Sequence, residues 1–156
     1  MLIKKISGEK ITEIKNFLNS WKDGVIEIGR IYLDKGDYVK QADKFLSHHY
    51  AFDTEKVLFK PTFTKEVIFR NKKDLAMSYF VGGNVNEDKG FALKPWQEIS
   101  LIEMDYIERN ELIVVMGALK FKPHELDEVT VVAFTFLLVN VDDSLKIKVH
   151  HSSPVT

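Results

Sequence analysis

The chain contains no cysteine, which excludes disulfide bonds and thiolate metal ligands. It has only 4 prolines and 8 glycines among 156 residues, and it has no low-complexity segment or linker. The formal charge is −1, and this argues against nucleic-acid binding because such proteins normally carry a basic excess. No apolar run approaches the roughly 20 residues that a membrane-spanning helix requires.

The remaining composition is that of an ordinary globular protein, with 45% hydrophobic and 29% charged residues. At this length we expect a single domain over residues 1–156, which would bury about 68–70% of the surface of the unfolded chain. The N-terminal segment Met1–Ser7 lacks the apolar core of a signal peptide. We therefore expect a cytoplasmic protein that interacts neither with a membrane nor with nucleic acid.

Hydrophobic periodicity predicts helices in the first part of the chain. Apolar residues recur every three or four positions from Ile11 to Tyr32, which indicates one helix of about six turns. Ser7 is the expected N-cap and Gly36 the expected stop. A second helix is expected from about Asp37, with one apolar side formed by Val39, Ala42, Phe45 and Leu46.

The pattern then changes to strands. Val57–Phe59 and Val67–Phe69 are predicted as short strands, and Leu75–Phe80 as a short helix that ends before Gly82. Four longer strands follow, over residues 99–107, 112–121, 129–139 and 144–153. Helices followed by consecutive antiparallel strands indicate an α+β fold. We expect a curved sheet that wraps around the N-terminal helix as a cone, with a cavity between them.

The C-terminal strand brings polar residues toward this interior. Leu145, Ile147 and Val149 alternate, and continuing the alternation places His151 and Ser153 on the same buried face. An unpaired buried polar group costs about 1–3 kcal/mol, so both side chains need partners. From the residues alone, either a structural hydrogen-bond network or a bound small molecule would supply these partners.

Two further hydroxyls are candidates for the mouth of the cavity. Thr62 follows the proline that ends a strand, and Tyr79 lies on the short helix before Gly82 and Gly83. The alternative is that Thr62 satisfies the local backbone and that Tyr79 packs as an aromatic residue.

Other kinds of site find less support. The histidine pairs 48–49 and 150–151 are adjacent and show no metal-ligand spacing, so no metal site is expected. We expect His48 and His49 to lie at the surface. Gly82 and Gly83 lack the spacing of a phosphate-binding loop, and the Gly-x-Ser-x-Gly motif of hydrolases is absent.

Six sequence blocks resemble, in order, the iota-class carbonic anhydrases: Val57–Thr62, Ser78–Gly83, Glu87–Ala92, Pro95–Trp96, Met116–Gly117 and His150–Pro154. This family belongs to the SnoaL-like superfamily and is similar to the association domain of calcium/calmodulin-dependent protein kinase. The resemblance implies a cone-shaped, cystatin-like α+β half-barrel, usually a homodimer. It also implies reversible hydration of carbon dioxide to bicarbonate by a lyase, without a metal cofactor in some members.

Carried onto this sequence, the resemblance implies a site of Thr62, Tyr79, His151 and Ser153. His151 would act as the base or proton relay, and the three hydroxyls would hold the oxygens of the substrate. Ala118 and Leu119 stand where relatives often have a polar and an aromatic residue. The strand from Val129 is also more apolar than expected, so we expect a more apolar cavity.

Two other functions remain open. The cone could bind a small, mostly apolar ligand without catalysis, or it could serve as a dimerisation domain. Both faces of the strand around residues 131–138 are apolar, and a domain of this size cannot enclose both of them. We therefore expect a homodimer.

Overall fold

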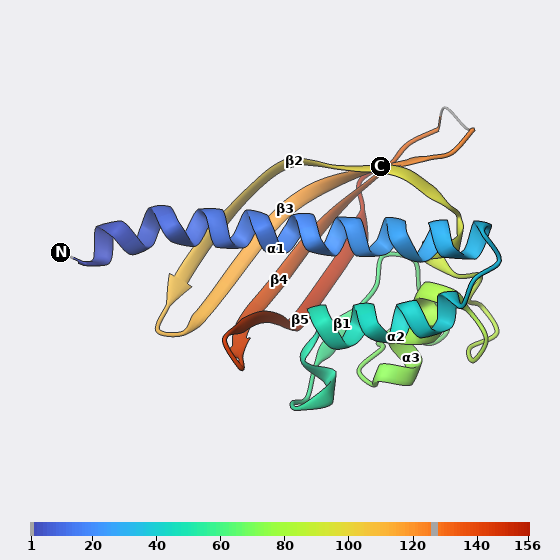
Figure 1. Ribbon diagram of the computed structural model, residues 1–156, viewed down its shortest axis with the longest axis horizontal. Coiled ribbons are helices and arrows are strands. Elements are labelled where there is room, and N and C mark those ends of the chain that lie inside the picture. Colours follow the sequence, from blue (N-terminus) through green and yellow to red (C-terminus); the bar gives the residue numbers. More distant parts are fainter. Residues whose placement is uncertain (1, 126–127) are drawn as a thin grey trace.

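The computed structural model describes residues 2–125 and 128–156. Helix α1 (Leu2–Leu33) runs across the strands of one curved sheet (Figure 1). Its predicted apolar stripe is buried at five positions that are each at most 4% exposed: Ile14, Leu18, Trp21, Val25 and Ile28. The helix begins at Leu2, so the prediction that Ser7 caps its start is wrong.

Helix α2 (Tyr38–His49) packs beside α1 and begins as predicted, because the carboxylate of Asp37 accepts a hydrogen bond from the Lys40 N–H at 3.0 Å. Its buried side consists of Ala42, Phe45, Leu46 and His49. Val39, expected on that side, is 48% exposed. Helix α2 therefore buries its apolar side from Ala42 onward.

Helix α3 (Lys73–Val81) lies next to α2 and ends at Gly82, whose φ of +77° suits glycine. The chain also forms two 3₁₀ turns. One, η1 (Ala51–Asp53), follows α2, and the other, η2 (Phe91–Leu93), precedes the first long strand.

The sheet has the strand order β1-β5-β4-β3-β2. Four long antiparallel strands form most of it: β2 (Trp96–Arg109), β3 (Leu112–Pro123), β4 (Thr130–Val141) and β5 (Ser144–Pro154). The short β1 (Leu58–Lys60) pairs in parallel with β5 at the edge. The predicted order of helices followed by four antiparallel strands is confirmed.

The predicted strand at Val67–Phe69 is wrong, because Val67 lies in a bend and Ile68 and Phe69 belong to no helix or strand. Its backbone is bonded elsewhere: the N–H of Val67 donates to the Glu87 carboxylate at 2.9 Å. The N–H of Arg70 donates to the Phe59 carbonyl at 2.7 Å. These bonds hold the segment against β1 and against the loop that follows α3.

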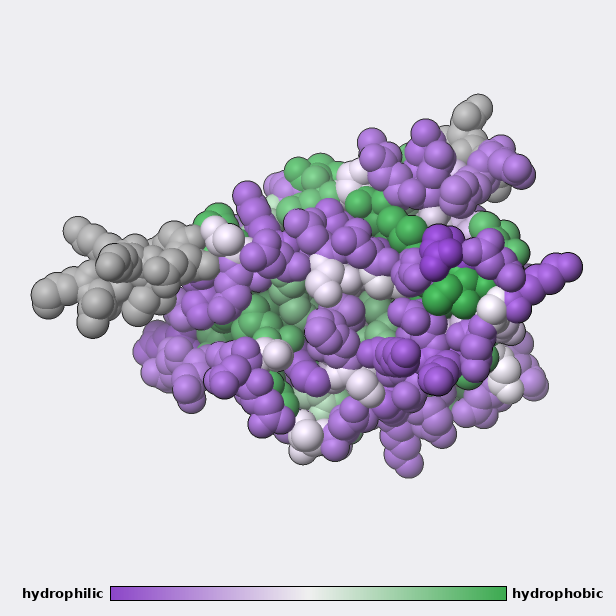
Figure 2. All heavy atoms as spheres, in the orientation of Figure 1, coloured by the Kyte–Doolittle hydropathy of each residue, from purple (hydrophilic) through white to green (hydrophobic). Residues whose placement is uncertain are grey.

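The core lies between the helices and the inner face of the sheet. Along β4 the buried residues Val132, Phe134, Phe136 and Leu138 alternate with half-buried residues from 131 to 137, and Val139 near the end of the strand is buried as well. The helix-bearing side shown in Figure 2 is mainly hydrophilic, as expected for helices with one buried side. Within the described residues, no helix has the length and apolar character to cross a membrane.

Candidate active site

A bulge in β5 decides which residues of the C-terminal strand face the interior. Ile147 pairs with Leu138 and Val149 with Leu137, so Lys148 is one extra residue on β5. A shift of one residue reverses the facing of every side chain beyond it. His150 and Ser152 are consequently buried, at 5% and 4% exposure.

The predicted placement of His151 and Ser153 is therefore wrong. Both side chains are exposed on the outer face of the sheet. His151 therefore does not line the inner cavity, where it was predicted to act as the base. The simple alternation from Leu145 fails because the sequence gives no sign of the bulge at Lys148.

His150 and Ser152 line a small inner cavity between α1, α3 and the sheet. The cavity offers about 20 Å³ to the centre of a water-sized molecule, which is enough for a water or another molecule of a few atoms. Thr62 and Tyr79 also line it, so these two predicted residues do meet in one place. The remaining wall is apolar: Trp21, Phe59, Pro61, Phe80, Phe91, Leu119, Phe121, Val132, Phe134 and Phe136.

Tyr79 is placed by α3 and held by the segment after β1. Its hydroxyl accepts a hydrogen bond from the Phe63 N–H at 3.3 Å. Burial raises the pKa of Tyr79, and its hydrogen bonds with the Phe63 N–H and with the Thr62 side chain oppose that rise only in part. The phenol is therefore neutral near pH 7 and can donate a hydrogen bond.

Four buried side chains form a continuous line of hydrogen bonds, here called the Tyr50 chain: Trp21, Tyr50, His150 and Ser152. All of them except Tyr50 also line the cavity. The indole Nε1 of Trp21 lies 3.2 Å from the Tyr50 hydroxyl, which lies 2.8 Å from Nδ1 of His150. Nε2 of His150 lies 2.6 Å from Oγ of Ser152. Burial lowers the pKa of His150 to about 3, with a smaller contribution from His151, so the imidazole is neutral.

Four residues of the site were not predicted from the sequence: His150, Ser152, Trp21 and Tyr50. His150 and Tyr50 are separated by 100 residues in the chain, and only the fold brings them together. The one available signal was the repeated His-His-Ser-Ser sequence, which offers a histidine and a serine to either face of β5.

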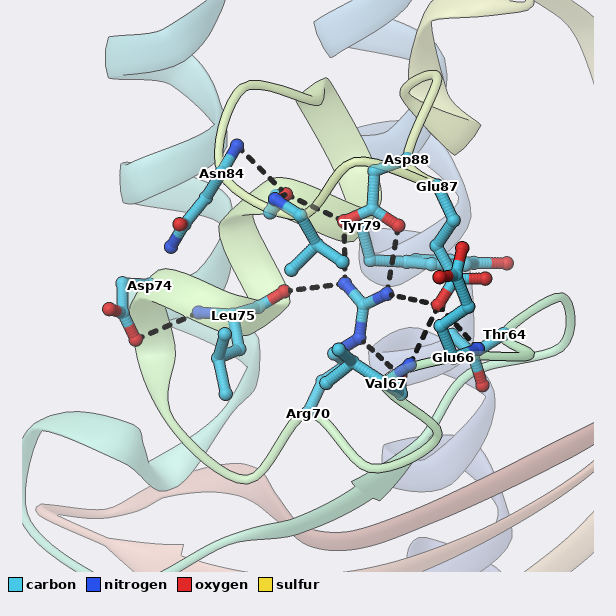
Figure 3. Close-up of polar contacts among 12 residues, drawn as sticks. Thr64, Glu66, Val67, Arg70, Asp74, Leu75, Tyr79, Asn84, Glu87 and Asp88 are labelled. Atoms are coloured by element: carbon cyan, nitrogen blue, oxygen red, sulfur yellow. Dashed lines mark hydrogen bonds and ion pairs between the residues drawn. The ribbon is translucent and has the colours of Figure 1, made fainter.

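A second buried group of polar residues supports Tyr79 from the other side. This Arg70 cluster consists of Arg70, Glu87 and Asp88, which are labelled in Figure 3, together with Ser78. The guanidinium of Arg70 is 0% exposed and donates to both carboxylate oxygens of Asp88, at 2.6 and 2.8 Å. Its central carbon lies 6.0 Å from the centre of the Tyr79 ring.

The Arg70 cluster joins two loops. The Glu87 carboxylate accepts hydrogen bonds from the N–H groups of residues 65, 66 and 67, and Arg70 donates to the Val67 carbonyl at 2.8 Å. These bonds, that of Val67 first, hold the pKa of Glu87 below its ordinary value. Ser78 Oγ donates to Asp88 at 2.6 Å, which connects the cluster to α3. The loop after Thr62 and the helix that carries Tyr79 are thereby fixed together.

An outer pocket of about 440 Å³ adjoins the inner cavity. Tyr79 and Phe91 line both spaces, and their rings stack with centroids 5.4 Å apart. The outer pocket also contains Lys89 and Lys94 beside Glu87 and Asp88. It therefore gives a route of mixed charge from solvent to the ring pair that bounds the inner cavity.

The remaining histidines show one further correction. His48 is exposed as predicted, but His49 is buried at 4% exposure and lies 2.8 Å from the Ser20 hydroxyl. Burial lowers the pKa of His49 to about 4. Over the described part of the chain, no group of three or more His, Cys, Asp or Glu residues could hold a metal ion.

Comparison with solved structures defines the class of the fold. An NTF2-like protein from Shewanella oneidensis superposes with a TM-score of 0.61 at 16% identity, covering 92% of this chain and 98% of that one. A structure described as a calcium/calmodulin-dependent protein kinase II association domain, from Xanthomonas campestris, gives 0.67 at 17% identity, covering 92% and 86%. The chain thus has the α+β cone fold that was predicted, and it shares this fold with an NTF2-like protein.

More similar proteins identify the family. The family model for metal-independent carbonic anhydrase matches residues 12–154, and the chain belongs to this family. A metal-independent carbonic anhydrase from a Nostoc species is 28% identical over 147 residues, covering 91% of this chain and 72% of that protein. The crystal structure of a cyanobacterial iota-carbonic anhydrase complexed with bicarbonate superposes with a TM-score of 0.85 at 27% identity, covering 93% and 92%. The predicted family is confirmed, and its metal-independent description agrees with the expectation of no cofactor.

Proposed function

We propose that this chain catalyses the reversible hydration of carbon dioxide to bicarbonate in the inner cavity, without a metal. One observation carries the proposal. In this chain, which belongs to the family, three hydroxyls and one imidazole line a cavity large enough for only a few atoms. A related structure, 27% identical, holds bicarbonate.

The lining of the cavity suits both forms of the substrate. The aromatic and aliphatic walls favour carbon dioxide, which is uncharged and apolar. Thr62, Tyr79 and Ser152 can donate hydrogen bonds to the oxygens as negative charge develops on bicarbonate. In the hydration direction the water oxygen bonds to the carbon, one C=O double bond becomes single, and one proton is released to solvent.

Stopped-flow measurement of carbon dioxide hydration, on chelator-treated protein of measured metal content, tests this function. We expect a rate above that of buffer. Thr62→Val should lower it, because valine has nearly the shape of threonine but cannot donate. Thr54→Val, at an exposed position, is the matched control. A folded wild type with no rate above buffer would exclude the enzymatic function.

Binding of a small ligand without catalysis is a second candidate, and the outer pocket favours it. At about 440 Å³ this pocket is far larger than carbon dioxide or bicarbonate requires. Native mass spectrometry of freshly purified protein would reveal a retained ligand. Such a ligand, together with absent hydration activity, would select this alternative.

We also propose a homodimer that buries the outer face of the sheet, in a protein that we expect to be cytoplasmic. Met116 is 63% exposed on β3, and the neighbouring outer positions of β4 are Val131, Ala133, Thr135 and Leu137. Met116→Asp should shift the mass measured by light scattering from dimer to monomer. A wild type that is already monomeric at all concentrations would overturn the proposal.

A further inference from the structure

The Tyr50 chain has a direction, and its first member sets it. The indole N–H of Trp21 can only donate, so the Tyr50 oxygen accepts from it at 3.2 Å. Tyr50 is 0% exposed, and its own hydrogen therefore needs an acceptor inside the protein. Among the described residues, the other polar side-chain atom bonded to this hydroxyl is Nδ1 of His150, at 2.8 Å.

The reverse arrangement leaves a buried hydrogen without a partner. If Nδ1 of His150 carried a proton, that proton would point at the Tyr50 oxygen. The oxygen would then accept from both Trp21 and His150, and its own hydrogen would have no acceptor. The arrangement in which Tyr50 donates to Nδ1 satisfies all three groups.

The tautomer of His150 follows from this direction. The neutral imidazole has one N–H, and with Nδ1 acting as acceptor the hydrogen lies on Nε2. Nε2–H then donates to Oγ of Ser152 at 2.6 Å. Phe59 stacks on the imidazole with ring centroids 4.6 Å apart, and Phe136 meets it edge-on at 4.6 Å, so the ring plane is held.

We infer that the Tyr50 chain fixes Ser152 as a hydrogen-bond donor to an oxygen of bicarbonate, with His150 as a positioning residue and not the base. This inference rests on the proposed function for the identity of the ligand. Because Oγ of Ser152 already accepts from His150, its own hydrogen is left to point into the cavity that it lines. Trp21 and Tyr50 are positioning residues that act through His150.

The chain runs in the opposite direction to a nucleophile-activating triad. In such a triad the serine donates to histidine Nε2, and Nδ1–H donates to a carboxylate. Here the third member is a phenol that itself donates to Nδ1, and both ring nitrogens are already engaged. The arrangement gives no lone pair on His150 to take a proton from water. It instead gives a prearranged donor for the charge that develops on the substrate.

Exchanging His150 separates a positioning role from a base. The side-chain amide of glutamine carries one acceptor and one donor joined through a single carbon, as neutral imidazole does. His150→Gln can therefore accept from Tyr50 and donate to Ser152, but it cannot take a proton near pH 7. We expect kcat of His150→Gln within about tenfold of wild type, and that of His150→Leu lower by roughly 10²–10³-fold, the effect of losing one oxyanion donor.

The tautomer itself is measurable without any variant. In protein labelled with ¹⁵N at histidine, the two ring nitrogens of His150 should report a proton on Nε2 and none on Nδ1 between pH 5 and pH 8. Tyr50→Phe removes the donor to Nδ1, so a population protonated on Nδ1 should appear and kcat should fall more than KM rises. His151→Gln, on the outer face, is the matched control and should change neither the tautomer nor kcat.

Two results would overturn the inference: a proton on Nδ1 in the wild type, or a folded His150→Gln as inactive as His150→Leu. If a variant fails to fold, the wild-type spectrum still decides. Failure of the proposed function is distinguishable, because a protein without hydration activity would still show the Nε2 tautomer. Addition of bicarbonate would then leave the His150 and Ser152 resonances unshifted.

Discussion

The Arg70 cluster and the Tyr50 chain are both buried groups of polar residues, but only the Tyr50 chain has a polar atom left for a ligand. In the Arg70 cluster the guanidinium donates to two carboxylates and two main-chain carbonyls, so its N–H donors are satisfied within the cluster. The Tyr50 chain is uncharged, and its last hydroxyl opens into the inner cavity. A closed charged cluster fixes the positions of segments, whereas an open neutral chain leaves one polar group available for a ligand. The comparison predicts that damage to the cluster lowers stability first, and damage to the chain lowers activity first.

Removal of the Arg70 guanidinium should give the largest change in stability. Arg70→Met leaves the buried carboxylate of Asp88 without its partner, which typically costs about 3–5 kcal/mol in the free energy of unfolding. Urea unfolding measures the loss. Arg30→Met removes an exposed guanidinium that also contacts two carboxylates, and it should change stability little. Equal losses in the two variants would contradict the assignment of the Arg70 cluster as a structural support.

The adjacent serines of β5 offer a matched pair for activity. Ser152→Ala removes a hydroxyl from the cavity, and the hydration rate should fall by about 10²–10³-fold. The free energy of unfolding should fall by about 1–3 kcal/mol, because the buried Nε2–H of His150 loses its acceptor. Ser153→Ala makes the same chemical change one residue later, on the exposed face, and should leave the rate unchanged. If Ser153→Ala lowered the rate and Ser152→Ala did not, Ser153 would face the cavity, as simple alternation predicted.

Acid should destabilise the protein through its two buried histidines. Their folded pKa values, about 3 for His150 and about 4 for His49, lie below the ordinary value near 6.5. The unfolded chain therefore binds more protons below pH 6.5, and stability falls as the pH decreases through that range. Each histidine should contribute a loss of about 2 kcal/mol between pH 7 and pH 5. The free energy of unfolding of His150→Gln should fall less between pH 7 and pH 5 than that of the wild type. The same pH dependence in both proteins would contradict the lowered pKa of His150.

Lys60 should have the smallest effect of the four. Its ammonium donates to the Ser152 carbonyl at 3.0 Å and to the Thr62 carbonyl at 3.4 Å, and so it links two segments that line the cavity. Lys60→Met should lower the free energy of unfolding by about 1 kcal/mol, as for one ordinary hydrogen bond. If Lys60→Met changed KM several times more than kcat, the hydrogen bonds of Lys60 would act mainly on substrate binding and not on the transition state.

Local patterns predicted the elements well, and the site less well, for identifiable reasons. The stripe of α1 and the alternation along β4 each reflect one buried face, so periodicity alone is sufficient there. Thr62 and Tyr79 were candidates from their positions next to a strand end and a double glycine, the family resemblance supported them, and the structure places both at the cavity. The facing of β5 failed because a bulge depends on pairing with β4, which no local pattern records.

The two polar groups escaped prediction for a related reason. Arg70 lies 17 and 18 residues before Glu87 and Asp88, and the connection needs α3 to turn the chain back. Tyr50 follows the last residue of α2, and only the pairing of Tyr50 with Ile147 of β5 brings it to His150. Contacts between distant segments are properties of the fold, and one sequence shows only the residues available to make them.

The doubled residues at the end of β5 make the site tolerant of small errors in strand pairing. Histidine occupies positions 150 and 151 and serine positions 152 and 153, so a slip of one residue past β4 would still turn an imidazole and an alcohol inward. Deletion of one of the two histidines between Val149 and Ser152 would thus still leave a histidine and a serine facing inward, with Ser153 in the place of Ser152. Alignments of distant relatives should accordingly be anchored on sheet register, since residue identity alone cannot tell the two copies apart.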